Sequence, residues 1–138
     1  MEDLKFWEIV KKINWPNIDY DRARMWFMKN YSLNVAKEFQ NLFYSKKAAL
    51  NRASKEDICC DSWDDTLSHI IGLGEEEYYR NMENPELILK REQHWDYKES
   101  FAYCIPYQDD YKKLTDKGYE SYINLAGSLL EKLRNSDE

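Results

Sequence analysis

Asp65 and His69 are the two residues whose types and spacing come nearest to a metal site. They are four positions apart, so they share one face of a helix and are within reach of a common metal ion. A carboxylate and an imidazole are both ordinary zinc ligands, but the chain has only two histidines, so Glu75 or His94 would have to complete the site. The alternative is a His69 on the helix surface that interacts with Asp65. The same region supports an enzyme hypothesis, a metal-dependent or carboxylate-based hydrolase centred on Asp64, Asp65 and His69.

The three cysteines favour plain thiols over a catalytic nucleophile. Cys60 precedes Asp61, and acidic surroundings disfavour the thiolate that a nucleophilic cysteine needs. Cys59 and Cys60 are neighbours, so a disulfide between them is strained, and three cysteines including Cys104 cannot all pair within one chain. With four glycines in the whole sequence and no phosphate-binding loop, we expect no catalytic residue and no cofactor.

Charge and aromatic residues together suggest a binding surface. The net charge is −6, but residues 1–58 carry +3, residues 59–110 carry −9 and residues 111–138 are neutral. Carboxylates steer a basic protein toward such a surface, while Trp and Tyr supply contact energy. The alternative is a solvated acidic face whose aromatic side chains point inward. The candidate partner-binding residues are Trp63, Asp64, Asp65, Glu75, Glu76, Tyr78, Tyr79 and Trp95.

Composition narrows the class of protein further. A hydrophobic fraction of 43% with 15% aromatic residues favours a globular fold, and 138 residues fit a single domain over 1–138. The acidic balance disfavours nucleic acid and anionic membranes as partners. No stretch has the roughly 18 consecutive apolar residues of a spanning helix, and Glu2 and Asp3 stand where a signal peptide is basic. We therefore expect a cytoplasmic protein.

The periodicity of apolar residues predicts an all-α fold, a compact bundle of about six helices. Asp19 or Asp21 is expected to cap the second helix, and Ser32 the third. Ser62 and Asp65 form a weak capping-box pattern, while Gly72 and Gly74 are expected to end that helix because glycine tolerates positive φ. Residues 100–106 are rich enough in β-formers for one short extended segment, but a buried helix is an equal alternative, because a short apolar run does not decide the period. The expected helices cover about residues 3–13, 19–29, 33–53, 62–71, 75–83, 85–89 and 117–133.

Several landmarks in order resemble a bacterial family called domain of unknown function 4240, over most of residues 4–118. The segment from Asp65 to Gly74 departs from the family pattern, being about one helical turn shorter and lacking its aromatic residues. The resemblance implies a small helical bacterial domain without an established activity, in which the Asp64-Asp65 pair is either a site or, as we prefer, a helix cap. The landmarks are Phe6-Trp7, Asp64-Asp65, Gly74 with Tyr78, Pro85 with Leu87, and Phe101, Tyr103 and Tyr111.

Two functions from different classes remain. The leading hypothesis is a non-enzymatic interaction protein, for instance an immunity-type protein that neutralises a toxin nuclease, which holds a basic partner through the acidic aromatic middle of the chain. The alternative is the hydrolase described above. The sequence does not identify the partner, a substrate or the oligomeric state.

Overall fold

The described part of the protein, residues 1–55, 61–93 and 100–113 of a computed structural model, is helical throughout. It contains seven α-helices, one 3-10 helix (η1) and no strand, which confirms the all-α prediction. The expected helix over 117–133 and the residues Cys59, Cys60, His94 and Trp95 lie outside the described ranges. The helices are α1 (Asp3–Ile13), α2 (Tyr20–Asn30), α3 (Leu33–Ser54), α4 (Asp61–Gly72), α5 (Glu75–Glu83), α6 (Glu86–Gln93), η1 (Phe101–Cys104) and α7 (Gln108–Lys113).

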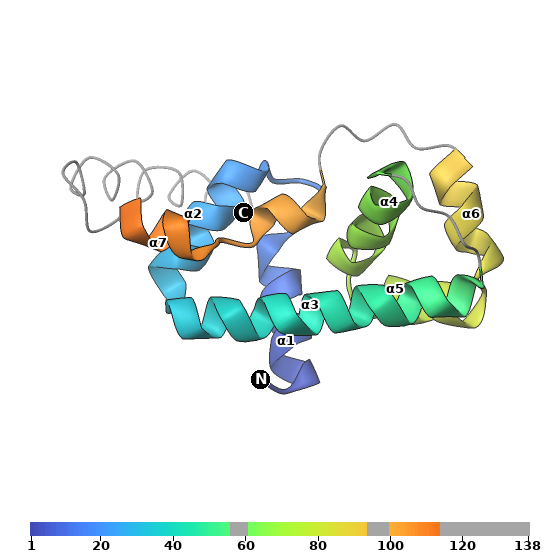
Figure 1. Cartoon of the computed structure of the whole chain (residues 1–138), viewed down its shortest axis with the longest axis horizontal. Coiled ribbons are helices and arrows are strands. Elements are labelled where there is room, and N and C mark those ends of the chain that lie inside the picture. Colours follow the sequence, from blue (N-terminus) through green and yellow to red (C-terminus); the bar gives the residue numbers. More distant parts are fainter. Residues whose placement is uncertain (56–60, 94–99, 114–138) are drawn as a thin grey trace.

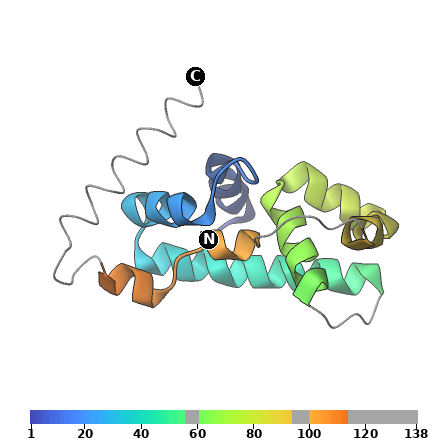
Figure 2. The same cartoon turned by 90° about the horizontal axis from the view of Figure 1, so that it is seen from above.

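Helix α3 is the longest element, with 22 residues, and runs along the length of the described part (Figure 1). Helix α1 crosses it near its middle, α2 and α7 lie toward one end, and α4, α5 and α6 gather toward the other (Figure 2). The short η1 contacts both α2 and α4 and so joins the two ends. Within the described ranges, no helix is both long enough and apolar enough to cross a membrane.

All five phenylalanines of the chain are fully buried and form the centre of the core. Phe6 of α1 stacks on Phe39 of α3 with ring centroids 4.6 Å apart, and Phe27 of α2 meets Phe39 at 5.4 Å. Phe43 of α3 lies 5.9 Å from Phe101 of η1. Burial of one such ring contributes on the order of 1.5–3 kcal/mol, so these contacts hold α1, α2 and η1 against α3.

Two of the expected helix starts are confirmed by their capping hydrogen bonds. The Asp19 carboxylate accepts the backbone N–H of Arg22 at 2.9 Å, and the Ser32 hydroxyl accepts that of Val35 at 3.3 Å. Each satisfies one of the backbone donors that the first turn of a helix leaves unpaired. Leu4, in the first turn of α1, is 69% exposed although it is apolar.

Of the two alternatives for residues 100–106, an extended segment or a buried helix, the structure shows a buried helical turn in the central part. Phe101–Cys104 form a 3-10 helix, which begins at Ser100, whose hydroxyl accepts the Ala102 N–H at 3.2 Å. The described residues include no strand with which an extended segment could pair. The apolar side chains Phe101, Cys104 and Ile105 are buried against helices instead, and a short apolar run is compatible with that outcome.

The two glycines after the fourth expected helix have different roles. Gly74 has φ +112, a conformation that favours glycine, so its predicted role is confirmed. Gly72 is required by close packing: a Cβ there would lie 2.6 Å from atoms of both Trp15 and Phe101. The absence of a side chain at Gly72 thus lets η1 and the segment after α1 approach α4.

Candidate functional site

His69 is buried in the core and is not the surface residue expected as the alternative to a metal ligand. It is 1% exposed, and its Nδ1 accepts the indole N–H of Trp15 at 2.9 Å. Trp15 comes from the segment after α1, so this hydrogen bond joins two parts of the chain that are 54 positions apart. Because Nδ1 is an acceptor, the neutral ring carries its proton on Nε2. One of the two ring nitrogens with which His69 could bind a metal is therefore engaged in the hydrogen bond from Trp15.

Among the described residues, the carboxylates expected around His69 do not join it in a group of three or more potential metal ligands. Within residues 1–55, 61–93 and 100–113, no three side chains of His, Cys, Asp or Glu are grouped so as to hold a metal ion. Asp64 is instead paired with Lys47 of α3 at 3.0 Å, and Glu75 stands on the following helix. The described residues thus give no geometric support to a hydrolase centred on Asp64, Asp65 and His69.

The prediction that the Asp64-Asp65 pair caps a helix is wrong. Helix α4 begins at Asp61, so Asp64 is its fourth residue, and the Ser62–Asp65 capping box falls inside the helix. Farther along α4, the hydroxyl of Thr66 donates to the Ser62 carbonyl at 2.7 Å, as helical threonines commonly do. The Asp64 carboxylate connects α4 to α3 through its ion pair with Lys47.

Two of the aromatic residues expected at a binding surface lie in the core. Trp63 and Tyr78 are each 3% exposed. The indole N–H of Trp63 donates to the Asn51 side chain at 2.7 Å, and the hydroxyl of Tyr78 donates to the Lys46 carbonyl at 2.9 Å. Both side chains therefore bind α3. Their expected position on the surface is wrong in this structure, whereas Tyr79, the neighbour of Tyr78, is 43% exposed.

The ammonium group of Lys46 occupies an aromatic enclosure beside the exposed Tyr79. Lys46 Nζ lies 5.3, 5.1 and 5.8 Å from the ring centres of Phe6, Trp7 and Tyr78. It also pairs with the Asp3 carboxylate at 3.2 Å. Cation–π attraction and the ion pair together compensate for the burial of this lysine, which is 8% exposed.

These contacts bring the start of α1 and the start of α5 to the same surface. The ring of Tyr79 lies 6.4 Å from that of Trp7 and 5.1 Å from that of Tyr78, both of which contact Lys46. Asp3, paired with Lys46, is therefore close to Tyr79, and Leu4 follows it along the chain. Glu75 and Glu76 are four and three residues before Tyr79 on α5, so they are its helical neighbours. We call Asp3, Leu4, Glu75, Glu76 and Tyr79 the α1–α5 patch.

Electrostatic interactions also couple Tyr79 to the carboxylates of the α1–α5 patch. The pKa of the Tyr79 phenol is raised above its ordinary value, first by partial burial and then by the negative charges of Asp3 and Glu75. Burial, and after it the neighbouring Tyr79 and the same Asp3 carboxylate, raises the pKa of Tyr78 to about 12. Both phenols are thus neutral hydrogen-bond donors at neutral pH, within the field of nearby carboxylates.

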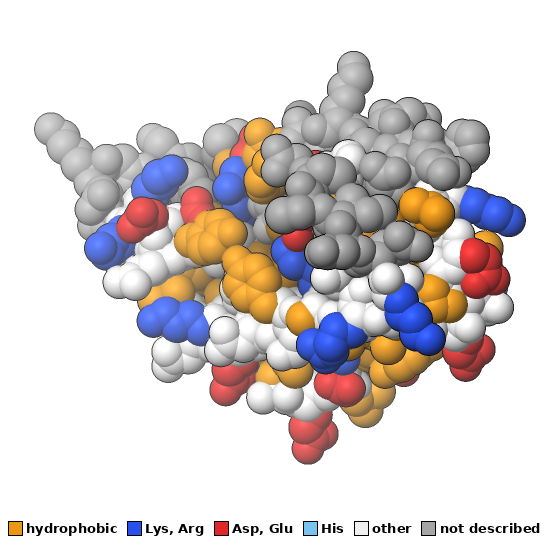
Figure 3. Space-filling view, turned by 45° about the vertical axis from the view of Figure 1, so that its right-hand side comes forward, with side chains coloured by type: hydrophobic (Ala, Val, Ile, Leu, Met, Phe, Trp, Pro, Cys, Tyr) orange, Lys and Arg blue, Asp and Glu red, His pale blue; other side chains and the backbone are white. Residues whose placement is uncertain are grey.

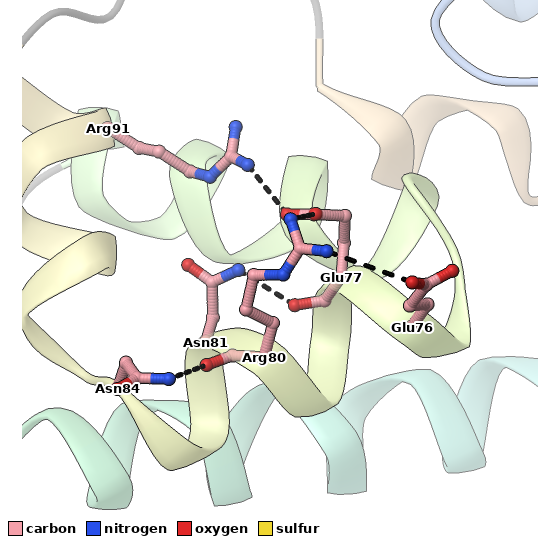
Figure 4. Close-up of polar contacts among 6 residues, drawn as sticks. All are labelled: Glu76, Glu77, Arg80, Asn81, Asn84 and Arg91. Carbon is pink, nitrogen blue, oxygen red and sulfur yellow. Dashed lines mark hydrogen bonds and ion pairs between the residues drawn. The ribbon is translucent and has the colours of Figure 1, made fainter.

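The three consecutive glutamates at the start of α5 have different roles, and Figure 4 shows two of them, Glu76 and Glu77. Glu77 binds Arg80 on its own helix and Arg91 of α6, the latter at 2.8 Å, so it connects α5 to α6. Glu76 is 3.7 Å from Arg80, and its side chain is 90% exposed. Glu75 is exposed and has no ion pair among the residues that the structure describes. Two carboxylates of the run therefore remain available at the surface.

Sequence reasoning found Glu75, Glu76 and Tyr79 of the patch but missed Asp3 and Leu4. Asp3 was visible in the sequence, where it counted against a signal peptide, and nothing in the sequence placed it beside α5. The space-filling view shows one face of the molecule, on which acidic side chains lie along the lower rim, basic side chains lie across the middle, and hydrophobic side chains lie between the charges (Figure 3).

Two hollows lie outside the patch. An open depression is lined by Glu8, Lys11, Lys12, Asn14 and Trp26, around the end of α1. A smaller pocket of about 310 Å³ lies between α3 and the segment that leads into α7.

Comparison of the chain with models of protein families, with curated proteins and with solved structures finds no match. The resemblance to domain of unknown function 4240 therefore stays a prediction.

Proposed function

We propose that this protein is a non-enzymatic interaction protein that binds a basic protein partner through the α1–α5 patch. The observation that carries the proposal is the position of Tyr79, which is 43% exposed and lies next to two carboxylates, Asp3 and Glu75. Exposed tyrosines within a ring of polar groups are frequent anchors of protein interfaces. The 69% exposed Leu4 adds apolar contact area beside it.

The sign of the charge favours a basic partner. Residues 59–110 carry a net charge of −9, and Glu75 and Glu76 belong to that acidic portion. A patch of this kind attracts an oppositely charged surface over a distance of about 8 Å in physiological salt. An immunity-type protein that neutralises a basic toxin nuclease is a function that this chemistry would serve.

The test starts from capture of a partner by the full chain from lysate of the source organism, followed by purification of the captured protein. The E75K/E76K variant reverses two exposed charges of the patch, and Y79A removes its anchor. We expect Y79A to weaken binding about tenfold or more, as loss of an interface anchor does. A captured partner that is acidic, or that binds both variants as tightly as the wild type, contradicts the proposal.

A matched control is available on neighbouring parts of the chain. Glu83 and Glu86 are also exposed, and Glu83 lies about 12 Å along α5 from Glu75. The E83K/E86K variant changes the net charge by the same amount and, like E75K/E76K, places a lysine in the first turn of a helix. We expect this variant to bind the partner nearly as the wild type does. Equal losses of affinity in the two double variants would mean that the overall charge of the protein, and not the patch, controls binding.

A further inference from the structure

The protein itself shows how a cation is held beside the α1–α5 patch. Lys46 Nζ lies 5.1 and 5.8 Å from the ring centres of Trp7 and Tyr78, and it pairs with the Asp3 carboxylate at 3.2 Å. Aromatic rings and a carboxylate thus hold a positive charge that is nearly removed from water. Cation–π attraction is stronger for such a desolvated cation than for one in open solvent.

Tyr79 offers the same combination of groups at the surface. Its ring lies 5.1 Å from that of Tyr78 and 6.4 Å from that of Trp7, and 43% of the residue is exposed. The pKa of its phenol is raised first by burial and then by the carboxylates of Asp3 and Glu75, so both charges lie near the ring. Within the described part of the chain, no lysine or arginine lies over the ring of Tyr79. A cation on this ring would therefore come from another molecule.

Arg80, the basic residue next to Tyr79 in sequence, is engaged elsewhere. Its guanidinium pairs with Glu76 and Glu77 (Figure 4). Glu75 is exposed and makes no ion pair with any residue that the structure describes. The negative charge of Glu75 beside Tyr79 is thus not compensated by the described residues, which favours a cation from outside.

We propose that the α1–α5 patch binds an arginine side chain of the basic partner, with the guanidinium stacked on Tyr79 and donating to Asp3 and Glu75. This inference rests on the proposed function and names the group that the patch recognises. The Asp3 carboxylate remains 60% exposed while it pairs with Lys46, so it can accept further donors. A guanidinium is planar, carries five N–H donors and is less strongly hydrated than an ammonium group. It therefore fits a ring flanked by two carboxylates better than a lysine ammonium does.

Small probes test this recognition without the partner. We expect titration of the full chain with Nα-acetyl-arginine N-methylamide to shift the NMR ring signals of Tyr79 as the probe concentration rises. At equal ionic strength, the lysine analogue should bind about threefold more weakly, and the citrulline analogue, which carries an uncharged urea, about tenfold more weakly. Tyr103, which is 50% exposed, is the internal reference and should not shift. Equal binding of the arginine and citrulline probes, or equal shifts of Tyr79 and Tyr103, would overturn the proposal.

Three variants assign the roles of the charge and of the ring. E75Q removes one carboxylate charge with little change in shape and should weaken binding of the arginine probe about threefold. E83Q makes the same change at the other end of α5, where the glutamate is also exposed, and should bind the probe as the wild type does. Y79L keeps an apolar side chain but lacks the aromatic ring, so the preference for arginine over lysine should disappear. Equal losses in E75Q and E83Q, or an unchanged preference in Y79L, contradict the assigned roles.

The arginine anchor and the proposed function fail separately. If E75K/E76K loses the purified partner while the arginine and citrulline probes bind alike, the proposed function stands and the arginine anchor is refuted. If the partner binds E75K/E76K as tightly as the wild type, the proposed function fails even where the arginine probe keeps its selectivity.

Discussion

The indole N–H of Trp15 donates a hydrogen bond of 2.9 Å to Nδ1 of His69, across 54 positions of the chain. Both side chains are buried, at 9% and 1% exposure, and the two rings meet edge to face. This contact holds the segment after α1 against α4. It also explains why a histidine that suggested a metal ligand from its spacing lies in the core.

We expect the Trp15–His69 pair to show a measurable coupling energy. In the W15F variant the Nδ1 atom of His69 loses its donor inside the core, which costs about 1–3 kcal/mol of unfolding free energy. In a double-mutant cycle with H69L, the coupling should be about 1 kcal/mol, because the second substitution removes the group left unsatisfied. Denaturant unfolding of the four proteins measures this value. Strictly additive effects would show that the hydrogen bond does not stabilise the protein.

Substitution of Gly72 by alanine should destabilise the protein by about 1–3 kcal/mol through overpacking. The new Cβ would lie 2.6 Å from the Phe101 ring, which is fully buried and cannot move freely. F101L replaces that ring by a smaller side chain and should recover part of the lost free energy of unfolding. G74A is the control: no atom lies within 4 Å of its Cβ, so its cost comes from the backbone at φ +112 and F101L should not relieve it.

Cys104 should be chemically inert in the folded protein. Burial raises the pKa of its thiol to about 12, and the weaker effect of Arg24 in the opposite direction does not restore an ordinary value. The thiolate is the reactive form, so a folded C59S/C60S variant should react very slowly with Ellman's reagent at pH 8. One thiol per chain should react once guanidinium unfolds the protein. Rapid stoichiometric reaction before unfolding would contradict the burial of Cys104.

Tyr78 should make the stability of the protein fall at alkaline pH. Its pKa is about 12 in the folded protein, raised chiefly by burial, against 10 in the unfolded chain. Between these values the unfolded state loses a proton that the folded state keeps, so the free energy of unfolding decreases as pH rises. Y78F lacks this proton, and its unfolding free energy should decline less steeply from pH 10 to about 12. Parallel pH profiles for the two proteins would contradict the assignment.

The same substitution should also cost about 1 kcal/mol at neutral pH, where it removes only the hydrogen bond from Tyr78 to the Lys46 carbonyl. Urea unfolding at pH 7 measures this loss separately from the alkaline effect.

Local chemistry made the helices predictable, while contacts across the chain determined the candidate site. Asp19, one of two cap candidates with Asp21, and Ser32, the expected restart of the helix, could be named from the sequence because a cap depends on three or four consecutive residues. Tyr78 and Tyr79 show the limit of this approach. They are adjacent in sequence and alike in chemistry, yet Tyr78 is buried against α3 and Tyr79 is exposed. The orientation of α5 decides between them, and it is set by Trp7 and Lys46 from distant helices.

Contacts between distant parts of the chain also decided the predictions that were wrong or left open. Ser62 and Asp65 have the spacing of a capping box, but both lie inside α4. The ion pair of Asp64 with Lys47 depends on how α4 lies on α3. Similarly, Phe101–Cys104 form a 3-10 helix that packs against other helices, and the described ranges include no strand with which these residues could pair.

The association rate with a purified basic partner, measured by stopped flow over a range of ionic strength, tests the proposed role of the α1–α5 patch most directly. The wild type and E83K/E86K should associate with similar rates that fall steeply as salt increases. E75K/E76K should associate about tenfold more slowly at low salt, with a shallower dependence on ionic strength. Identical rates and identical salt dependence for the wild type and E75K/E76K would contradict the proposed binding surface.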